Sequence, residues 1–207
     1  MKVLAINGSP HEKGSTFTSI NIAIAELEKQ GIEVELVHIG DGPVQGCTGC
    51  GSCRNHPQKH CVFDDDLVNI CLEKSKAVNG LIISSPVYYS GIAGTMKSFL
   101  DRFFFTGPNL KYKVGMALTV LRRSGGTPTF QQINNYFYLA GMVITPSQYW
   151  NVIHGTNPDE VIQDEEGVQI IQTAAGNMAW LIKLIENGKD SVPYPEPPRR
   201  VRTNFIH

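Results

Sequence analysis

The sequence contains neither a long apolar run nor an excess of charge of one sign. No stretch approaches the ~18 consecutive apolar residues of a membrane-spanning helix, and the apolar run at the start is too short for a signal peptide. The formal net charge of -1 lacks the basic excess of a nucleic-acid-binding protein. With 42% apolar and 18% charged residues among 207, the composition is ordinary for a globular protein. We therefore expect a cytoplasmic protein with no nucleic-acid or membrane partner.

Several motifs that carry phosphate chemistry are also missing. The residues after the first apolar run, Asn7-Gly8-Ser9, stand where a receiver domain needs acids. No lysine follows Gly14, the Walker A spacing is wrong, and the Gly-x-Gly-x-x-Gly dinucleotide fingerprint is absent. No cysteine has an arginine six residues further on, as a low-molecular-weight phosphatase requires. These absences exclude a receiver domain, a Walker-type nucleotidase and that class of phosphatase.

Strand-like and helix-like apolar patterns alternate about five times along the chain. Short apolar runs predict strands, and apolar residues at steps of three and four predict helices. The predicted strands cover residues 2–7, 34–39, 81–85, 114–120 and 142–144, the last continuing near 148–150. The predicted helices cover residues 17–27, 64–76, 95–103, 127–140 and 171–185. This alternation is typical of an α/β protein with a doubly wound parallel sheet.

Residues that favour helix ends support these boundaries. Gly31, Gly141 and Gly188 follow three of the predicted helices, where glycine commonly ends a helix. Thr127 and Pro128 have the order of an N-cap and a first helical residue. The helix over 64–76 would begin with acidic residues in its first turn, a favourable place for negative charge.

Two segments depart from the alternating pattern. Residues 42–63 form a long irregular stretch, and long loops of this kind are often functional. The tail over 190–207 is rich in proline and arginine and cannot be a regular helix. We expect one domain over 1–189, with an insertion at about 42–63. The tail would then be an arm that lies on a partner subunit, or a frayed terminus.

The loop after the first strand is a candidate phosphate site, because ligands of such folds lie outside the carboxyl ends of the strands. Its glycines let backbone amides approach an anion, its hydroxyls can donate, and the next helix begins there. This set, without a fixed lysine, suits one terminal phosphate without a metal, as FMN presents. An ordinary strand-to-helix turn is the alternative. The candidate residues are Ser9, His11, Gly14, Ser15 and Thr16.

The loops after the third and fourth strands are candidates for contact with a planar ring. Adjacent tyrosines can stack on such a ring, adjacent glycines let the backbone touch it, and a cation near flavin N1 raises the flavin potential. Core aromatics and a plain turn are the alternatives. The candidate residues are Pro86, Val87, Tyr88, Tyr89, Ser90, Gly91, Arg122, Arg123, Ser124, Gly125 and Gly126.

Together these segments resemble the NAD(P)H-dependent FMN reductase family. Asn-Gly-Ser-Pro with Gly-Ser-Thr, Ser-Pro-Val-Tyr-Tyr and Tyr-Trp-Asn carry the resemblance, which covers nearly the whole chain. Further matching residues are Lys97, Asp101, Arg102, Arg202, Thr203, Asn204 and Phe205. The resemblance implies a flavodoxin-like three-layer sandwich, with a five-stranded parallel sheet of order 2-1-3-4-5 and helices on both faces.

The same resemblance implies a cofactor, a co-substrate and an assembly. It implies FMN, with phosphate contacts at Ser9, Ser15 and Thr16 and ring contacts at Pro86 to Gly91. NAD(P)H would be the co-substrate, and the chain would form a homodimer or homotetramer. His11 departs from the family, because relatives often carry arginine there, and this weakens any role for His11 in neutralising the phosphate.

Four of the five cysteines form one compact set, Cys47-x2-Cys50-x2-Cys53-x7-Cys61. The first three have ferredoxin-like spacing, which bends a loop so that three sulfurs converge. This segment narrows the resemblance to the iron–sulfur flavoproteins, where these four cysteines would ligate a [4Fe–4S] cluster. A zinc site, with His56 and His60 as spare ligands, and free thiols are the alternatives. Cys71 lies at an apolar helix position and is expected in the core.

The expected function is that of an FMN-dependent oxidoreductase, with the flavin itself performing the electron chemistry. Electrons would pass between NAD(P)H or a reduced carrier and a quinone, a flavin or another acceptor, and the redox partner could be a small molecule or a protein. No side chain is assigned as catalytic. A non-enzymatic FMN electron carrier of the flavodoxin type is the alternative. Flavodoxins are usually strongly acidic, so the net charge of -1 argues against it.

Overall fold

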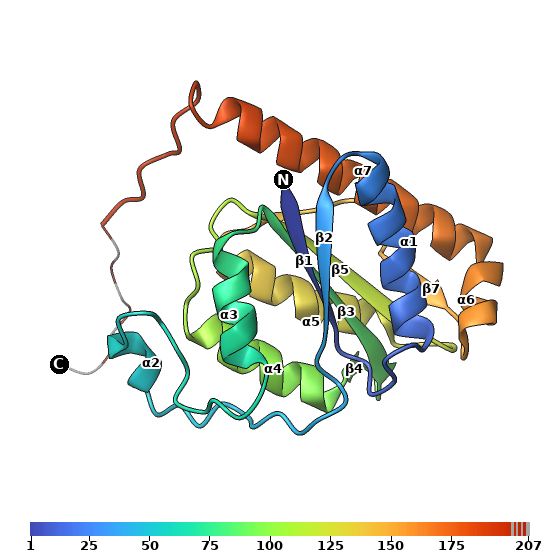
Figure 1. Ribbon diagram of the computed structural model, residues 1–207, viewed down its shortest axis with the longest axis horizontal. Coiled ribbons are helices and arrows are strands. Elements are labelled where there is room, and N and C mark those ends of the chain that lie inside the picture. The colour runs from blue at the N-terminus through green and yellow to red at the C-terminus, as the bar shows by residue number, and fades with distance from the viewer. Residues whose placement is uncertain (200, 202, 204, 206–207) are drawn as a thin grey trace.

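We describe residues 1–199, 201, 203 and 205 of the chain in a computed structural model. A parallel sheet runs through its centre (Figure 1). Its main strands are β1 (Lys2–Asn7), β2 (Glu33–His38), β3 (Gly80–Tyr88), β5 (Val114–Leu121) and β6 (Val143–Ile144). Their order is β2-β1-β3-β5-β6, and every neighbouring pair is parallel. This confirms the expected flavodoxin-like order 2-1-3-4-5.

Helices cover both faces of the sheet and bury two separate cores. One face carries α1 (Ser15–Lys29), α7 (Glu165–Gly188) and the short α6 (Pro158–Gln163), and the other carries α3 (Val68–Lys76), α4 (Gly94–Phe105) and α5 (Gly126–Leu139) (Figure 1). Alternate residues of each strand point to opposite faces, so Val3 packs in the first core and Leu4 in the second. Cys71 is fully buried in the second core, as expected.

The start of α5 differs from the prediction. Gly125, not Thr127, is the cap residue, and the helix begins at Gly126. Gly125 has a φ of 88°, which favours glycine, and its carbonyl accepts a hydrogen bond of 2.8 Å from the Thr129 hydroxyl. Thr127 and Pro128 therefore lie inside the first turn.

The fifth predicted strand is split in two. β6 pairs with the start of β5, and β7 (Val152–His154) pairs with its end. Residues 145–151 leave the sheet between them, so the predicted continuation near 148–150 was wrong. Pro146 lies in this segment and has no backbone N–H to donate to a ladder.

The starts of α3 and α7 also differ from the prediction. α3 begins at Val68 and has no acidic residue in its first turn. Asp66 precedes it and accepts a hydrogen bond of 3.0 Å from the Val68 amide. α7 begins at Glu165, earlier than predicted, because the Asp164 side chain accepts from the Gly167 amide at 3.0 Å and caps this helix.

The described part of the tail has no helix or strand after Gly188. Tyr194 stacks on Tyr112 of the same chain, with ring centroids 4.4 Å apart. Arg202 and Asn204, named above, lie outside the described residues.

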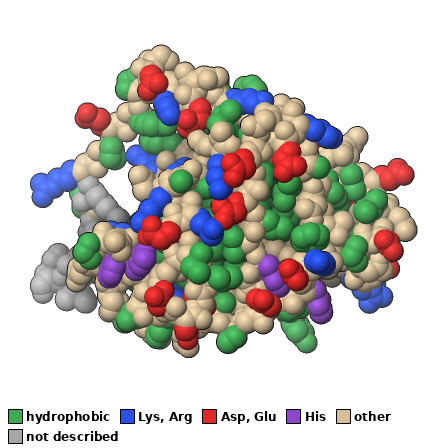
Figure 2. Space-filling view, viewed as in Figure 1, with side chains coloured by type: hydrophobic (Ala, Val, Ile, Leu, Met, Phe, Trp, Pro, Cys, Tyr) green, Lys and Arg blue, Asp and Glu red, His purple; other side chains and the backbone are tan. Residues whose placement is uncertain are grey.

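The described surface is mixed in charge. On the face drawn in Figure 2, Lys and Arg side chains are interspersed with Asp and Glu side chains. This agrees with the net charge of -1. Of the helices in the described part of the chain, none has the length and apolar character needed to cross a membrane.

Candidate functional site

The loop between β1 and α1 is folded by a buried asparagine. The Asn7 side chain accepts from the Ser9 amide at 3.0 Å and donates to the Glu12 carbonyl at 3.1 Å. His38, at the end of β2, contacts the Ser9 carbonyl through Nε2 at 2.7 Å. Because an added Cβ at Gly40 would lie 1.8 Å from that carbonyl, only glycine allows this close approach. Asn7, His38 and Gly40 therefore shape the loop. Asn7 was named above only as part of a motif, and His38 and Gly40 were not predicted.

The predicted phosphate residues gather where this loop enters α1. Ser9 and Thr16 are buried, and the Ser9 oxygen accepts from the His11 amide at 3.1 Å, which leaves its hydroxyl proton free to donate. Gly14 caps α1 without a side-chain hydrogen bond, so the first helix amides remain available to an anion. His11 is exposed. This donor set fits a terminal phosphate.

The loop after β3 is a tight hairpin to β4 (Gly91–Ile92), which pairs antiparallel with β3. Tyr89 and Ser90 form its turn with φ values of 48° and 59°, as a two-residue type I′ turn requires. The side chain of Tyr89 is fully exposed and that of Tyr88 about half exposed. Neither is a core aromatic, so the alternative explanation of these tyrosines is excluded. Both offer ring surface at the carboxyl edge of the sheet.

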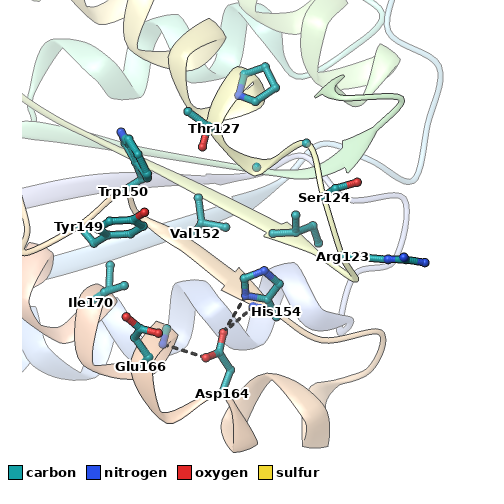
Figure 3. A pocket seen from close by; sticks show the side chains of 15 residues that line it. Arg123, Ser124, Thr127, Tyr149, Trp150, Val152, His154, Asp164, Glu166 and Ile170 are labelled. Atoms are coloured by element: carbon teal, nitrogen blue, oxygen red, sulfur yellow. Dashed lines mark hydrogen bonds and ion pairs between the residues drawn. The ribbon is translucent and has the colours of Figure 1, made fainter.

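The loop after β5 packs against this hairpin. An added Cβ at Gly125 would lie 2.8 Å from the Cα atom of Ser90 and 2.9 Å from Cγ1 of Val87. The structure thus brings two of the predicted ring segments, 86–91 and 122–126, into contact. Arg122 and Arg123 are exposed, and Figure 3 shows the Arg123 side chain pointing away from the neighbouring cavity.

A cavity of about 300 Å³ lies beside the loop after β5 (Figure 3). Tyr149 and Trp150 form one wall, with their rings edge to face at 4.4 Å. On another wall, Asp164 accepts the His154 amide at 2.7 Å and contacts the His154 ring nitrogen Nδ1 at 3.2 Å. Gly125 lines this cavity and also contacts the β3–β4 hairpin. No local sequence pattern predicts the His154–Asp164 pair, because its members lie in different elements.

The four clustered cysteines line one cavity. Cys53 is carried by the short helix α2 (Ser52–Asn55) and is buried, Cys61 is partly buried, and Cys47 and Cys50 are exposed. Gly49 and Gly51 bend the segment with φ values of 68° and 74°, which favour glycine.

The pKa values of the cysteine thiols depend on their burial and on neighbouring side chains. Burial raises the pKa of the Cys53 thiol, and the three neighbouring cysteines add to this effect. A hydrogen bond with Ser52 lowers the pKa of the Cys50 thiol. In contrast, burial raises the pKa of Cys71 to about 12, which keeps that thiol protonated. Four thiols around one cavity fit the ligand set of a four-iron cluster.

The predicted spare zinc ligands lie apart from this cavity. His56 and His60 stack on each other with ring centroids 5.4 Å apart, and His60 Nε2 contacts Glu73 at 2.6 Å. Neither histidine lines the cysteine cavity. Within the described residues, no three His, Cys, Asp or Glu side chains are placed to share a single ion. His56 and His60 are therefore not placed to serve as spare ligands of a zinc ion in the cysteine cavity.

Comparisons with known proteins agree with this architecture. Residues 1–157 match the family described as NADPH-dependent FMN reductase. An iron–sulfur flavoprotein of Methanocaldococcus jannaschii is 31% identical over 195 residues, covering 90% of this chain and all of the relative.

Solved structures show the same fold at low sequence identity. RosB, solved with 8-demethyl-8-formylriboflavin-5'-phosphate bound, has a TM-score of 0.69 at 17% identity, covering 100% of this chain and 94% of its own. An archaeal flavodoxin has a TM-score of 0.59 at 14% identity, covering 88% and 99% of the two chains. The family match and the overlap with the iron–sulfur flavoprotein confirm the resemblance inferred from the loops: this chain belongs to the NADPH-dependent FMN reductase family of flavin-dependent oxidoreductases.

Proposed function

We propose that this protein holds FMN across the carboxyl ends of β1, β3 and β5 and moves electrons between NAD(P)H or a reduced carrier and a quinone, a flavin or another acceptor. The observation that supports this proposal most strongly is that the loops after β1, β3 and β5 lie at the same edge of the sheet, and that the last two are in contact. β1, β3 and β5 are neighbours in the sheet, and Gly125 packs directly against the β3–β4 hairpin. A ligand with a phosphate at one end and a planar ring at the other matches this layout.

Each loop has a distinct role in holding the cofactor. The first α1 amides, with the hydroxyls of Ser9, Ser15 and Thr16, would bind the phosphate. The hairpin residues 86–91 and the backbone of 124–126 would hold and orient the ring. When bound, FMN supplies the hydride and electron chemistry, while the protein supplies binding and orientation.

We also propose that Cys47, Cys50, Cys53 and Cys61 hold a [4Fe–4S] cluster. Their shared cavity supports this, as does the printed name of the archaeal relative, an iron–sulfur flavoprotein. Such a cluster supplies one-electron chemistry.

The cavity beside Gly125 favours an enzyme over a simple electron carrier. Its aromatic wall of Tyr149 and Trp150 can accept a second planar ring, such as that of a co-substrate. Steady oxidation of NADH or NADPH by the flavin-loaded protein would support the enzyme. No reaction with either nucleotide, combined with fast electron exchange with a ferredoxin, would show a carrier instead.

Removing single hydroxyls tests the phosphate site. We expect Ser9→Ala or Thr16→Ala to weaken FMN binding by about 1.5–3 kcal/mol, since each would lose a hydrogen bond to a charged group. This corresponds to a roughly 10- to 150-fold higher Kd, measurable by quenching of flavin fluorescence. Ser191→Ala is the control, because Ser191 lies after α7, far along the chain from the loop, and its hydroxyl donates to the carbonyl of Gly188, the last residue of α7. Equal FMN affinity in all variants would mean that the loop is merely a turn.

We further propose a cytoplasmic homodimer or homotetramer. Tyr138 and Leu139 at the end of α5, and Trp180 on α7, are large apolar side chains that are more than 60% exposed. None of the five cysteines in the described structure is in a disulfide, which suits a reducing compartment. Sedimentation velocity of the flavin-loaded protein tests the assembly, and a single species at the monomer mass would refute it.

A further inference from the structure

Arg102 lies next to the cysteine cavity although it belongs to α4, far away in sequence. Its side chain is completely buried and lines the same cavity as the four cysteines. Its Nε atom donates to the sulfur of Cys61 at 3.2 Å. A charged group is rarely buried without specific partners, and the Cys61 sulfur is one of the partners of this guanidinium.

The other donors of Arg102 fasten both ends of the cysteine segment. Nη1 donates to the Gln45 carbonyl at 3.2 Å, before the first cysteine, and Nη2 donates to the Phe63 carbonyl at 2.7 Å, after the last. Nη1 also forms an ion pair with Asp66, whose side chain is only 5% exposed. One planar guanidinium thus contacts four groups, namely one sulfur, two backbone carbonyls and one carboxylate. Lysine cannot reproduce this geometry.

Asn69 on α3 secures the same stretch from the other side. Its Oδ1 atom accepts from the Cys61 amide at 2.8 Å, and its Nδ2 atom donates to the Cys61 carbonyl at 3.0 Å. The backbone of Cys61 is therefore held by Asn69, whereas its sulfur is contacted by Arg102. Substitution of Arg102 should therefore change the surroundings of the sulfur while Asn69 still holds the Cys61 backbone in place.

We propose that Arg102 is a positioning residue that orients the Cys61 sulfur as a cluster ligand and raises the reduction potential of the cluster. This rests on the proposed [4Fe–4S] group. Reduction adds negative charge to a cluster and its thiolates. An N–H donor and a positive charge at a ligating sulfur therefore stabilise the reduced form more than the oxidised form. Asp66 has the opposite effect, because its carboxylate offsets the guanidinium charge.

Because Arg102 and Asp66 carry opposite charges, we expect their substitution to shift the reduction potential of the cluster in opposite directions. Arg102→Gln removes the cation and leaves the Asp66 carboxylate, so the cluster potential should fall. Asp66→Asn keeps the Arg102 donor and removes the compensating anion, so the potential should rise. We expect each shift to correspond to at least a tenfold change in the ratio of oxidised to reduced cluster, which is about 59 mV for a one-electron couple. A purely structural role for Arg102 would not make the two variants differ in sign.

The test is an anaerobic redox titration followed by the electron paramagnetic resonance signal of the reduced cluster. It uses the full-length, flavin-loaded protein and its Arg102→Gln and Asp66→Asn variants. Lys97→Gln is the matched control, since Lys97 is a cation on the same helix but 49% of its side chain is exposed and it pairs with Asp101 instead. We expect the control to keep the wild-type potential.

The outcomes separate this inference from the proposed cluster itself. A wild-type protein without iron would refute the cluster, whatever the variants do. A wild-type cluster with unchanged potentials in both variants, or with shifts of the same sign, would overturn the role of Arg102. If Arg102→Gln retains flavin and wild-type circular dichroism but binds no iron, the orienting role is supported, and the sign of the Asp66→Asn shift then decides the electrostatic role.

Discussion

Cys61→Ala should remove most of the iron from the protein, from about four atoms per chain to near zero, and leave FMN binding intact. Cys61 lines the shared cavity with Cys47, Cys50 and Cys53, and its sulfur is the one that Arg102 contacts. The loss of one of four thiolates opens the cluster to solvent. The FMN loops belong to other segments of the chain and should fold unchanged. Iron analysis and the visible spectrum of protein purified without oxygen provide the measurement.

Cys71→Ala is the matched control for this experiment. Cys71 lies on α3 and is fully buried in the core, and burial raises its pKa to about 12. A protonated thiol in an apolar core is not a metal ligand. We expect the control to keep its iron. The account of the cysteine cavity would fail if Cys61→Ala kept four irons, or if Cys71→Ala lost them while remaining folded.

Gly125→Ala should weaken FMN binding at least tenfold and destabilise the protein by about 1–3 kcal/mol, the usual cost of a residue forced into a sparsely populated backbone region. Gly125 has a φ of 88°, and an added Cβ would meet both Cα and Oγ of Ser90 at 2.8 Å. The loop after β5 must then move away from the β3–β4 hairpin. This separates the two segments that we expect to hold the flavin ring.

Gly176→Ala is the control for the glycine variant. Gly176 lies within α7, and an added Cβ there meets nothing within 4 Å. Alanine favours a helix over glycine by about 1 kcal/mol, so this variant should be at least as stable as the wild type. Thermal unfolding and flavin titration of both variants give the comparison. Full FMN affinity in Gly125→Ala would show that contact between the two loops is not needed for the ring.

Much of the fold could be predicted from the sequence, because the apolar patterns of strands and helices are local. The alternation of strands and helices and the glycines after α1 and α5 follow from such patterns. The order of the main strands, in contrast, was implied by the family resemblance. The cap of α5 was misplaced because Thr127-Pro128 is a strong local signal. The actual start depends on Gly125, whose left-handed conformation suits its packing against Ser90. That contact joins two loops and leaves no local pattern.

Of the candidate site, only the loops that follow the strands could be predicted from the sequence. Serines, tyrosines and glycines after successive strands can be read from the sequence, since these strand ends share one edge of the sheet. The supporting residues cannot be read in this way. Arg102 contacts Cys61 and Gln45 across 41 and 57 positions of the chain, and His154 meets Asp164 across two elements. Such pairings depend on how α4 and α7 pack, which only the tertiary structure shows.

The most direct test of the central claim is the visible absorption spectrum, with iron analysis, of protein purified without oxygen and supplied with FMN. We predict two flavin bands on a broad iron–sulfur absorption that bleaches on reduction, with about four irons per chain. A protein that binds no flavin, even after FMN is added, would contradict the account.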